Sequence, residues 1–419
     1  MYREEDLYAL FGECSGVCTD SRNVGTDTMF FALHGASFDG NRFAFDALQS
    51  GAKYAVVDSD GPLSAHPEAA DRMVRVNDTL AALQHLAREY RERLAIPIIG
   101  IVGSNGKTTT KELVARVLAE RFDVYATKGN LNNHIGVPLT LLAMTDRTQF
   151  GVVEMGASAC GEIGALCEIA KPDYGIITNI GRSHLEGFGG VEGIRRGKGE
   201  LFDYLARSGG RAFVPEEDEV LMAMAAERKG MAVETYSRRV ADGVESRLSG
   251  DYNRYNIAAA VAVGRFVDID DKCIREAVAS YVPDNNRSQE MRTERGNLLI
   301  VDCYNANPSS MQAALANLAS HEGGRKVMIL GDMLELGEWS AGEHRRILEI
   351  AAAIDDAELL LVGNEFASSC RSVPVEGACR TFASTDEAAE YLRQNPPTGA
   401  TILLKGSHRW ALEKLVKLL

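Results

Sequence analysis

Short apolar runs, separated by polar and glycine-rich turns, dominate the first part of the chain. Residues 28–33, 53–58 and 73–76 have the length and the β-branched or aromatic content that is typical of strands. Asp78 precedes apolar residues at helical spacing, and aspartate is a common N-cap in that position. The pattern therefore predicts a small first α/β domain over residues 1–80, with a helix beginning at its end.

From Ile96 onward the pattern changes to apolar strands that alternate with helices. This alternation predicts parallel βαβ units and sheets covered by helices on both faces. The polar segment 283–288 marks a second boundary, so we expect a central domain over residues 81–286 and a third α/β domain over residues 287–419. The predicted strands are residues 98–102, 150–154, 174–179, 298–302, 326–330, 359–362 and 401–404, and the predicted helices include residues 108–120 and 162–170.

Composition narrows the class of protein. The chain has 419 residues and a net charge of -14, which argues against a general binder of nucleic acid or anionic membrane. No apolar run approaches the roughly 18 residues of a membrane span, and the first residues lack the layout of a secretion signal. Eight cysteines show no paired metal-ligand spacing. We expect a cytoplasmic protein with no nucleic-acid partner and no membrane insertion, and a monomer, since no segment predicts a large unpaired apolar face.

The strongest chemical signal is the segment 98–110, in which an apolar strand leads into Gly-Ser-Asn-Gly-Lys-Thr and then a helix. Gly103 and Gly106 allow backbone N–H groups to approach phosphate oxygens, and Lys107 can reach the β- and γ-phosphates. The Thr108 hydroxyl can ligate Mg²⁺. The alternative is an ordinary glycine turn, and the first glycine of the motif is displaced by one position. The strand–turn–helix context favours a site for ATP or GTP.

Other polar groups follow predicted strands, where ligands of open parallel sheets bind. Glu154 and His184 occupy such positions, and a carboxylate there suits Mg²⁺, although each residue taken alone is more often a cap or a surface group than a ligand. Asn253 and Asn256 precede an alanine-rich helix and would either contact an adenine or cap the helix. The segment 301–308 fits a ligand loop or a capped turn.

Together these segments resemble the Mur ligases, the ATP-dependent amide ligases of peptidoglycan precursor synthesis, over essentially the whole chain. The P-loop form is shared with the folylpolyglutamate synthases, whereas two later segments resemble the Mur member that adds D-alanyl-D-alanine. The residues that carry the resemblance are 20–22, 38–40, 103–109, 130–133, 154–156, 178–181 with His184, 198–200, 302, 304–308, 331–337 and 405–407.

The resemblance implies three domains: an N-terminal α/β UDP-binding domain, a central P-loop ATPase domain and a C-terminal Rossmann-like domain that closes on ATP. It implies ATP contacts from Gly103, Ser104, Asn105, Gly106, Lys107, Thr108, Thr109, Asn253, Asn256, Arg287, Asp302 and Tyr304. It implies substrate contacts from Ser21, Arg22, Phe38, Asp39, Gly40, Asn41, Asn132, Asn133, Lys405 and Ser407.

The resemblance also implies a Mg²⁺ site formed by Thr108, Glu154, His184 and Lys198, with Lys107, Lys198 and His184 as the catalytic residues. An ammonium group would repel Mg²⁺. In this family the lysine that matches Lys198 is carbamylated by CO₂, which converts it into an anionic oxygen ligand. We expect the same modification here.

The activity that the resemblance implies is the joining of D-Ala-D-Ala to UDP-MurNAc-tripeptide through an acyl phosphate, which yields UDP-MurNAc-pentapeptide, ADP and phosphate. One alternative is another ligase of the same type, adding a different amino acid or polyglutamate. A second is a P-loop binding or regulatory module without ligase activity. Phosphate release that depends on each substrate would distinguish the three.

Overall fold

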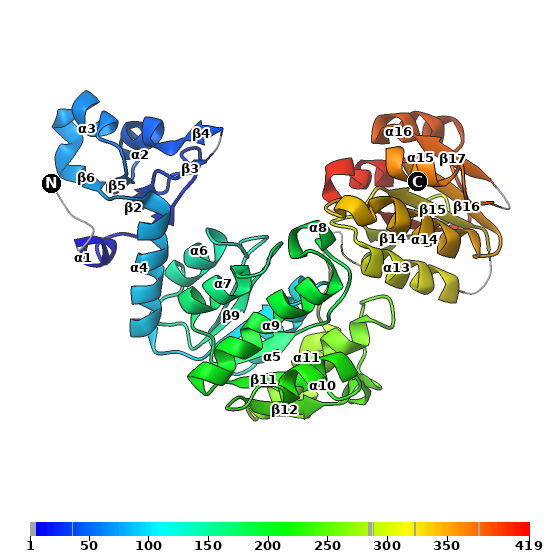
Figure 1. Ribbon diagram of the computed structural model, residues 1–419, viewed down its shortest axis with the longest axis horizontal. Helices are drawn as coiled ribbons and strands as arrows, with labels where there is room; N and C mark the ends of the chain where they lie inside the picture. Colours follow the sequence, from blue (N-terminus) through cyan, green and yellow to red (C-terminus); the bar gives the residue numbers. More distant parts are fainter. Residues whose placement is uncertain (1–5, 36, 284–286, 288, 322–323, 376–377) are drawn as a thin grey trace.

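The chain folds into three successive units, each built around one larger sheet, in the computed structural model (Figure 1), which describes residues 6–35, 37–283, 287, 289–321, 324–375 and 378–419. The expected α/β class is confirmed: each sheet is mostly parallel and has helices beside it. The start of the chain lies outside the described residues. So does most of the predicted boundary segment 283–288, of which only Pro283 and Arg287 are described.

The first sheet has four parallel strands in the order β1-β2-β5-β6. The three strands predicted in this region are confirmed in slightly shorter form, whereas β1 has no continuous apolar run and was missed. A hairpin, β3–β4, follows β2. The elements are α1 Leu7–Phe11, β1 Gly16–Cys18, β2 Thr28–Phe31, β3 His34–Gly35, β4 Phe38–Asp39, α2 Ala44–Gln49, β5 Tyr54–Val57, α3 Gly61–Ala65 and β6 Met73–Arg75.

Helix α4, Thr79–Leu94, connects the first sheet with the second (Figure 1). The predicted N-cap is confirmed, because the Asp78 carboxylate accepts a hydrogen bond from the backbone N–H of Ala81 at 2.8 Å. Leu83 and Leu86 are fully buried, and the helix packs against α6 and α7 of the second unit. The helix therefore fixes the first unit to the flank of the central one.

The second sheet has six parallel strands in the order β12-β11-β10-β7-β9-β8. Strands β7 and β9 have the predicted bounds, and β10 ends two residues earlier than predicted. The elements are β7 Ile98–Val102, α5 Lys107–Leu118, β8 Val124–Ala126, α6 Gly136–Leu142, β9 Phe150–Glu154, α7 Glu162–Ala170, β10 Tyr174–Ile177, α8 Leu185–Phe188, α9 Val191–Ser208, β11 Arg211–Pro215, α10 Glu219–Ala226, β12 Ala232–Tyr236, α11 Asn253–Phe266 and α12 Asp271–Ala279.

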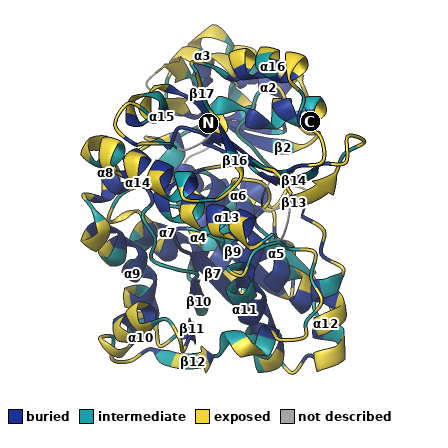
Figure 2. Cartoon of the chain, turned by 90° about the vertical axis from the view of Figure 1, so that its right-hand side faces the viewer, coloured by how far each residue is buried: buried dark blue, intermediate teal, exposed yellow. Residues whose placement is uncertain are grey.

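Side chains that alternate along β7 supply two separate cores. Ile98 and Val102 belong to the core that also contains buried residues of α7 and α9. Ile99 and Ile101 belong to the core formed with α5, α11 and α12. Helices therefore cover both faces of the central sheet, and Figure 2 shows its strands buried beneath partly exposed helices. This burial explains why the strand is a continuous apolar run.

The third sheet has the order β13-β14-β18-β15-β16-β17, with only β13 antiparallel to its neighbour. The polar edge strand β13 was missed, because an edge strand needs no apolar run. The elements are β13 Gln289–Arg292, β14 Leu298–Asp302, α13 Pro308–Ser320, β15 Lys326–Gly331, α14 Ser340–Ala352, β16 Ala357–Val362, α15 Asn364–Ser369, β17 Cys379–Phe382, α16 Thr385–Gln394 and β18 Thr401–Lys405. Within the described chain, no helix is both long and apolar enough to span a membrane.

Candidate active site

The turn between β7 and α5 has the geometry of a phosphate-binding loop. Gly103 has φ +144° and Gly106 has φ +80°, values that side chains disfavour. A Cβ on Gly103 would lie 1.9 Å from the Thr178 hydroxyl oxygen, and one on Gly106 would lie 2.6 Å from Asn256 Oδ1. Helix α5 begins at Lys107, so the free N–H groups of its first turn and the positive end of its dipole face the ligand side of this loop.

The Lys107 side chain folds back over the loop. Its Nζ donates to the carbonyl oxygens of Gly103 at 2.8 Å and Ser104 at 3.4 Å. Burial lowers the pKa of Lys107, while the nearby Glu154 carboxylate raises it. The loop thus places the ammonium group of Lys107 beside uncharged backbone N–H donors. This combination suits a bound phosphate group.

The two asparagines at the start of α11 face this loop. Asn256 Oδ1 accepts a hydrogen bond from the Thr110 hydroxyl at 3.1 Å, and its Nδ2 donates to Asn253 Oδ1 at 2.8 Å. Asn253 Nδ2 in turn donates to the Ser249 carbonyl. Both residues lie within the helix, which has Tyr252 as its N-cap, so the capping alternative is wrong.

A cavity of about 800 Å³ opens between the P-loop and the third unit. The structure brings together around it most residues predicted for ATP and metal binding, from both units. Of the predicted site residues, the cavity is lined by Ser104, Asn105, Gly106, Lys107, Thr108, Thr109, Asn132, Asn133, Glu154, His184, Asn253, Asn256, Arg287, Asp302, Tyr304 and Lys405.

Glu154, at the end of β9, is 2% exposed. Its Oε1 accepts a hydrogen bond from Asn132 Nδ2 at 2.8 Å, whereas its buried Oε2 has no hydrogen-bond partner among the described residues. A buried, unpartnered carboxylate oxygen is costly unless another group binds it. This orphaned oxygen at the cavity wall therefore fits a cation ligand.

His184 lies where the second and third units meet. It is the N-cap of α8 with φ +52°, and its Nδ1 forms an ion pair with the carboxylate of Glu335 from the third unit. This contact lowers the pKa of Glu335. Beside it, Arg182 pairs with Glu343, and the Arg182 backbone N–H donates to Ser309 Oγ at 2.8 Å.

Lys198, on α9, is 1% exposed and is absent from the cavity lining. Its Nζ donates to the carbonyl oxygen of Ala157, a lining residue, at 3.2 Å, and it lies 4.9 Å from the centre of the Phe188 ring. Burial, assisted by the positive charge of Lys107, lowers the pKa of Lys198 to about 7. Among the described residues it forms no ion pair within contact distance, and the more distant Glu162 and Glu200 carboxylates, which raise its pKa, only partly offset the effect of burial.

The third unit contributes charged and aromatic groups to the cavity. Lys405, 1% exposed, donates to Asp302 Oδ2 at 2.6 Å and to the Asn305 carbonyl at 3.1 Å. The Arg287 guanidinium lies 3.8 Å from the centre of the Tyr304 ring. A cation held on an aromatic face at a cavity wall suits contact with a charged, planar ligand.

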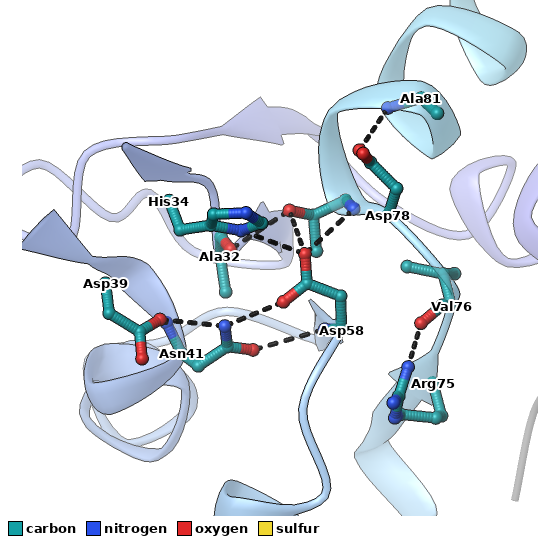
Figure 3. A network of polar contacts seen from close by, with 10 residues as sticks. Ala32, His34, Asp39, Asn41, Asp58, Arg75, Val76, Asp78 and Ala81 are labelled. Atoms are coloured by element: carbon teal, nitrogen blue, oxygen red, sulfur yellow. Dashed lines mark hydrogen bonds and ion pairs between the residues drawn. The ribbon is translucent and has the colours of Figure 1, made fainter. Parts of the chain in front are cut away.

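The residues expected to hold the UDP group lie elsewhere, in the first unit, and do not line the cavity. Figure 3 shows that Asn41 bridges two carboxylates: its Nδ2 lies 2.8 Å from Asp39 Oδ1 and 2.8 Å from Asp58 Oδ1. Arg22 is exposed and paired with Asp20. The other residues expected at the UDP end are Ser21, Phe38 and Gly40, which are also absent from the cavity lining. Two further predicted site residues, Gly103 and Ser407, do not line the cavity either.

Two asparagines from segments noted in the sequence, but not named there as site residues, join the P-loop to its surroundings. Asn179 Oδ1 accepts from the Asn105 backbone N–H at 3.1 Å, and Asn307 Nδ2 donates to Asn105 Oδ1 at 2.7 Å. Asn307 also caps α13 in a capping box with Ser310. Asn179 lies two residues after the end of β10, and Asn307 ends the loop from β14 to α13, so both belong to the loops at the carboxyl ends of parallel strands, which is the signal that points to them.

The parallel α/β fold, the P-loop and the cations around the cavity define the class: a nucleotide-binding enzyme that handles phosphoryl groups between two domains. Comparison with known families agrees. Residues 13–91 match "Mur ligase family, catalytic domain", residues 101–243 "Mur ligase middle domain", and residues 286–408 "Mur ligase, glutamate ligase domain". The chain belongs to the Mur ligase family.

Individual relatives cover nearly the whole chain. The UDP-N-acetylmuramoyl-tripeptide–D-alanyl-D-alanine ligase of Bacillus subtilis is 34% identical over 96% of this chain and 92% of its own. The ligase of the same name from Escherichia coli is 31% identical over 96% and 93%. A crystal structure of MurF from Acinetobacter baumannii matches with a TM-score of 0.85 at 27% identity, covering 99% and 98% of the chains. MurF from Thermotoga maritima in complex with ADP matches at 0.82 and 25% identity, covering 98% and 97%.

Proposed function

We propose that this chain is an ATP-dependent ligase that joins D-alanyl-D-alanine to UDP-N-acetylmuramoyl-tripeptide, giving the pentapeptide, ADP and phosphate. The observation that carries this function is the similarity to ligases of that name along 96% of the chain. The P-loop cavity, with cations from both units, supports it. The reaction belongs to peptidoglycan biosynthesis, and so to cell-wall biogenesis, cell shape and cell division.

The first step activates a carboxylate, because an oxide ion is too poor a leaving group for direct attack by an amine. A terminal carboxylate oxygen of the tripeptide attacks the γ-phosphorus of ATP, and ADP leaves. Lys107 and the N–H groups at the start of α5 stabilise the charge on the transferring phosphoryl group. Asn253, Asn256, Arg287 and Tyr304 hold the nucleotide.

In the second step, the amine of D-Ala-D-Ala attacks the acyl carbon, the tetrahedral intermediate expels phosphate, and the nitrogen loses a proton. Water would destroy the acyl phosphate, so the cavity must exclude it. The third unit contributes Asp302 and Lys405 to the same cavity as the P-loop, which supports closure of this unit over the reacting groups.

The residues present fit Mg²⁺. The described residues contain no cluster of three histidine, cysteine, aspartate or glutamate side chains arranged as a metal cage. Mg²⁺ usually binds through one or two carboxylates together with substrate phosphates, and the orphaned Glu154 Oε2 provides such an oxygen. When bound, the ion would neutralise phosphate charge. Thr108, Glu154, His184 and carbamylated Lys198 would hold it.

Burial of Lys198 supports its carbamylation. With a pKa of about 7, a large fraction of the amine is neutral at neutral pH. A neutral amine adds to CO₂ and releases one proton, which yields an anionic carbamate. That charge would offset the nearby positive charge of Lys107, whereas an ammonium group adds to it.

The remaining expectations assign the substrate ends to different domains. The first domain, 1–80, would hold the UDP end through Ser21, Arg22 and residues 38–41, all of which lie in its sheet unit. Asn132 and Asn133 would contact the substrate in the central domain, 81–286. Lys405 and Ser407 of the third domain, 287–419, would lie near the incoming dipeptide. We further propose that the protein acts in the cytoplasm, since its nucleotide substrates occur there. We also propose that it is a monomer.

The test is phosphate release in a mixture of ATP, Mg²⁺, UDP-MurNAc-tripeptide and D-Ala-D-Ala, with each component omitted in turn. We expect release only in the complete mixture, together with the mass of the pentapeptide product. Release with a different amine would retain the ligase chemistry and overturn the dipeptide assignment. No release in any mixture would overturn the ligase function in favour of a binding module.

A further inference from the structure

Two segments from different units meet at His184. The Glu335 carboxylate, in the turn after β15, pairs with His184 Nδ1, and the Glu335 carbonyl oxygen accepts from the Glu186 backbone N–H at 3.3 Å. Gly337 packs against the same segment, since a Cβ there would lie 3.0 Å from Glu186 Cγ. The contact therefore involves both main chain and side chain.

Both members of the pair have a backbone conformation that side chains rarely adopt. His184 has φ +52° and Glu335 has φ +60°. Non-glycine residues persist in this region only where surrounding contacts hold them, and such residues cluster at functional sites. Each of the two strained residues contacts the other, so the arrangement of one depends on the arrangement of the other.

The pair is poorly suited to a purely stabilising role. The side chains are 27% and 60% exposed, respectively, and exposed ion pairs contribute little to stability. The Glu335 carboxylate does, however, lie against Nδ1 of the ring, and a carboxylate in that place favours the neutral tautomer with its hydrogen on Nδ1. That tautomer carries its free lone pair on Nε2, which is how carboxylates orient metal-binding histidines.

We propose that Glu335 is a positioning residue for His184: docking of the third unit fixes the imidazole tautomer and leaves Nε2 available as a ligand. This inference rests on the proposed function for its use in catalysis, but not for its geometry. It makes completion of the cation site depend on the presence of the third unit. The availability of His184, a metal ligand from the central domain, would thereby depend on whether the third unit has docked.

The first test needs neither metal nor turnover. Protein labelled with ¹⁵N-histidine at alkaline pH reports the tautomer of His184, assigned by comparison with a His184→Gln variant. We expect the Nδ1–H form in the wild type, and a mixture of both forms in Glu335→Ala. Glu335→Gln should restore the Nδ1–H form, because its amide oxygen accepts the same hydrogen bond. Glu390→Ala, which removes an exposed ion pair on α16, is the matched control and should match the wild type.

The second test is Mn²⁺ binding in the presence of ADP, followed by electron paramagnetic resonance. Loss of a carboxylate partner of a metal-binding histidine typically weakens metal affinity about 10- to 100-fold, and we expect this for Glu335→Ala with partial rescue in Glu335→Gln. An unchanged tautomer in Glu335→Ala would overturn the proposal. Tighter Mn²⁺ binding would also overturn it, since Glu335 would then be blocking the ligand nitrogen. A tautomer change in a protein without ligase activity would refute only the proposed function.

Discussion

At the scale of single residues, the site buries two lysines and one unpartnered carboxylate oxygen, and burying each of these groups costs stability. Lys107 and Lys198 are both buried enough to lower their pKa values, and each depends on a carbonyl oxygen for its hydrogen bonding. Glu154 is buried with one oxygen unpartnered among the described residues. Such groups are retained at a cost in stability, which is typical of functional sites.

We expect Lys107→Met to reduce kcat about 100- to 1000-fold, the usual effect of removing one preorganised group that stabilises developing charge. The measurement is phosphate release at saturating substrates. The control is Lys272→Met, which removes an exposed lysine on α12. Near-normal turnover of Lys107→Met, in a protein with an unchanged circular dichroism spectrum, would contradict its placement on the phosphates.

Carbamylation of Lys198 should increase with pH. Its folded-state pKa of about 7 means that the amine is mostly protonated below that pH and mostly neutral above it. With ¹³C-bicarbonate, the carbamate resonance should therefore grow between about pH 6 and about pH 8, as the neutral fraction rises. Lys198→Met corrects for carbamates at other amines. A spectrum identical to that of the variant would refute the modification.

At the scale of elements, most functional groups lie at the ends of strands and the beginnings of helices, with Lys198 in the middle of α9 as an exception. The P-loop joins β7 to α5, Glu154 ends β9, and Asp302 ends β14. Helix termini supply free N–H groups, and strand ends expose polar side chains that the sheet interior excludes. Helix α4 serves a different purpose, because it connects two units and carries no site residue.

Asp78→Ala should destabilise the first turn of α4 by about 1 kcal/mol, the usual value of an N-cap aspartate. Hydrogen exchange at the Ala81 amide, which donates to this carboxylate, should become correspondingly faster. Asp71→Ala, at an exposed aspartate outside the helix, should leave that rate unchanged. Equal exchange in the two variants would show that the cap contributes nothing.

At the scale of the whole molecule, the cavity exists because the third unit docks on the carboxyl ends of the central strands. The contacts that hold it there include Arg182 with Glu343, His184 with Glu335, and the Arg182 backbone with Ser309. Asn317 Nδ2 adds a further contact to Ser249 Oγ at 2.8 Å. The site is therefore only as well ordered as this junction.

Arg182→Ala should loosen the junction. We expect a larger radius of gyration by X-ray scattering without ligands, a smaller difference when nucleotides are bound, and a fall in kcat of about 10- to 100-fold from misplaced groups. Arg345→Ala removes a surface pair with Glu349 on α14 and is the control. A scattering profile equal to that of the wild type would show that Arg182 does not hold the units together.

The sequence by itself determined the class of fold and the phosphate-binding loop. Strands β7, β9 and β14 have their predicted bounds because buried parallel strands are continuous apolar runs, and the P-loop is a local strand–turn–helix motif. Edge strands such as β12 and β13 escaped prediction, since a strand exposed on one side carries no such run.

The tertiary structure alone decided which distant residues share the site. Asn307 contacts Asn105 and Glu335 contacts His184 across the boundary between two units, and no periodicity of the chain encodes these pairings. Local patterns reflect whether a residue is buried within its own element. Contacts between domains depend instead on how complete surfaces fit together, and that fit is a property of the folded molecule.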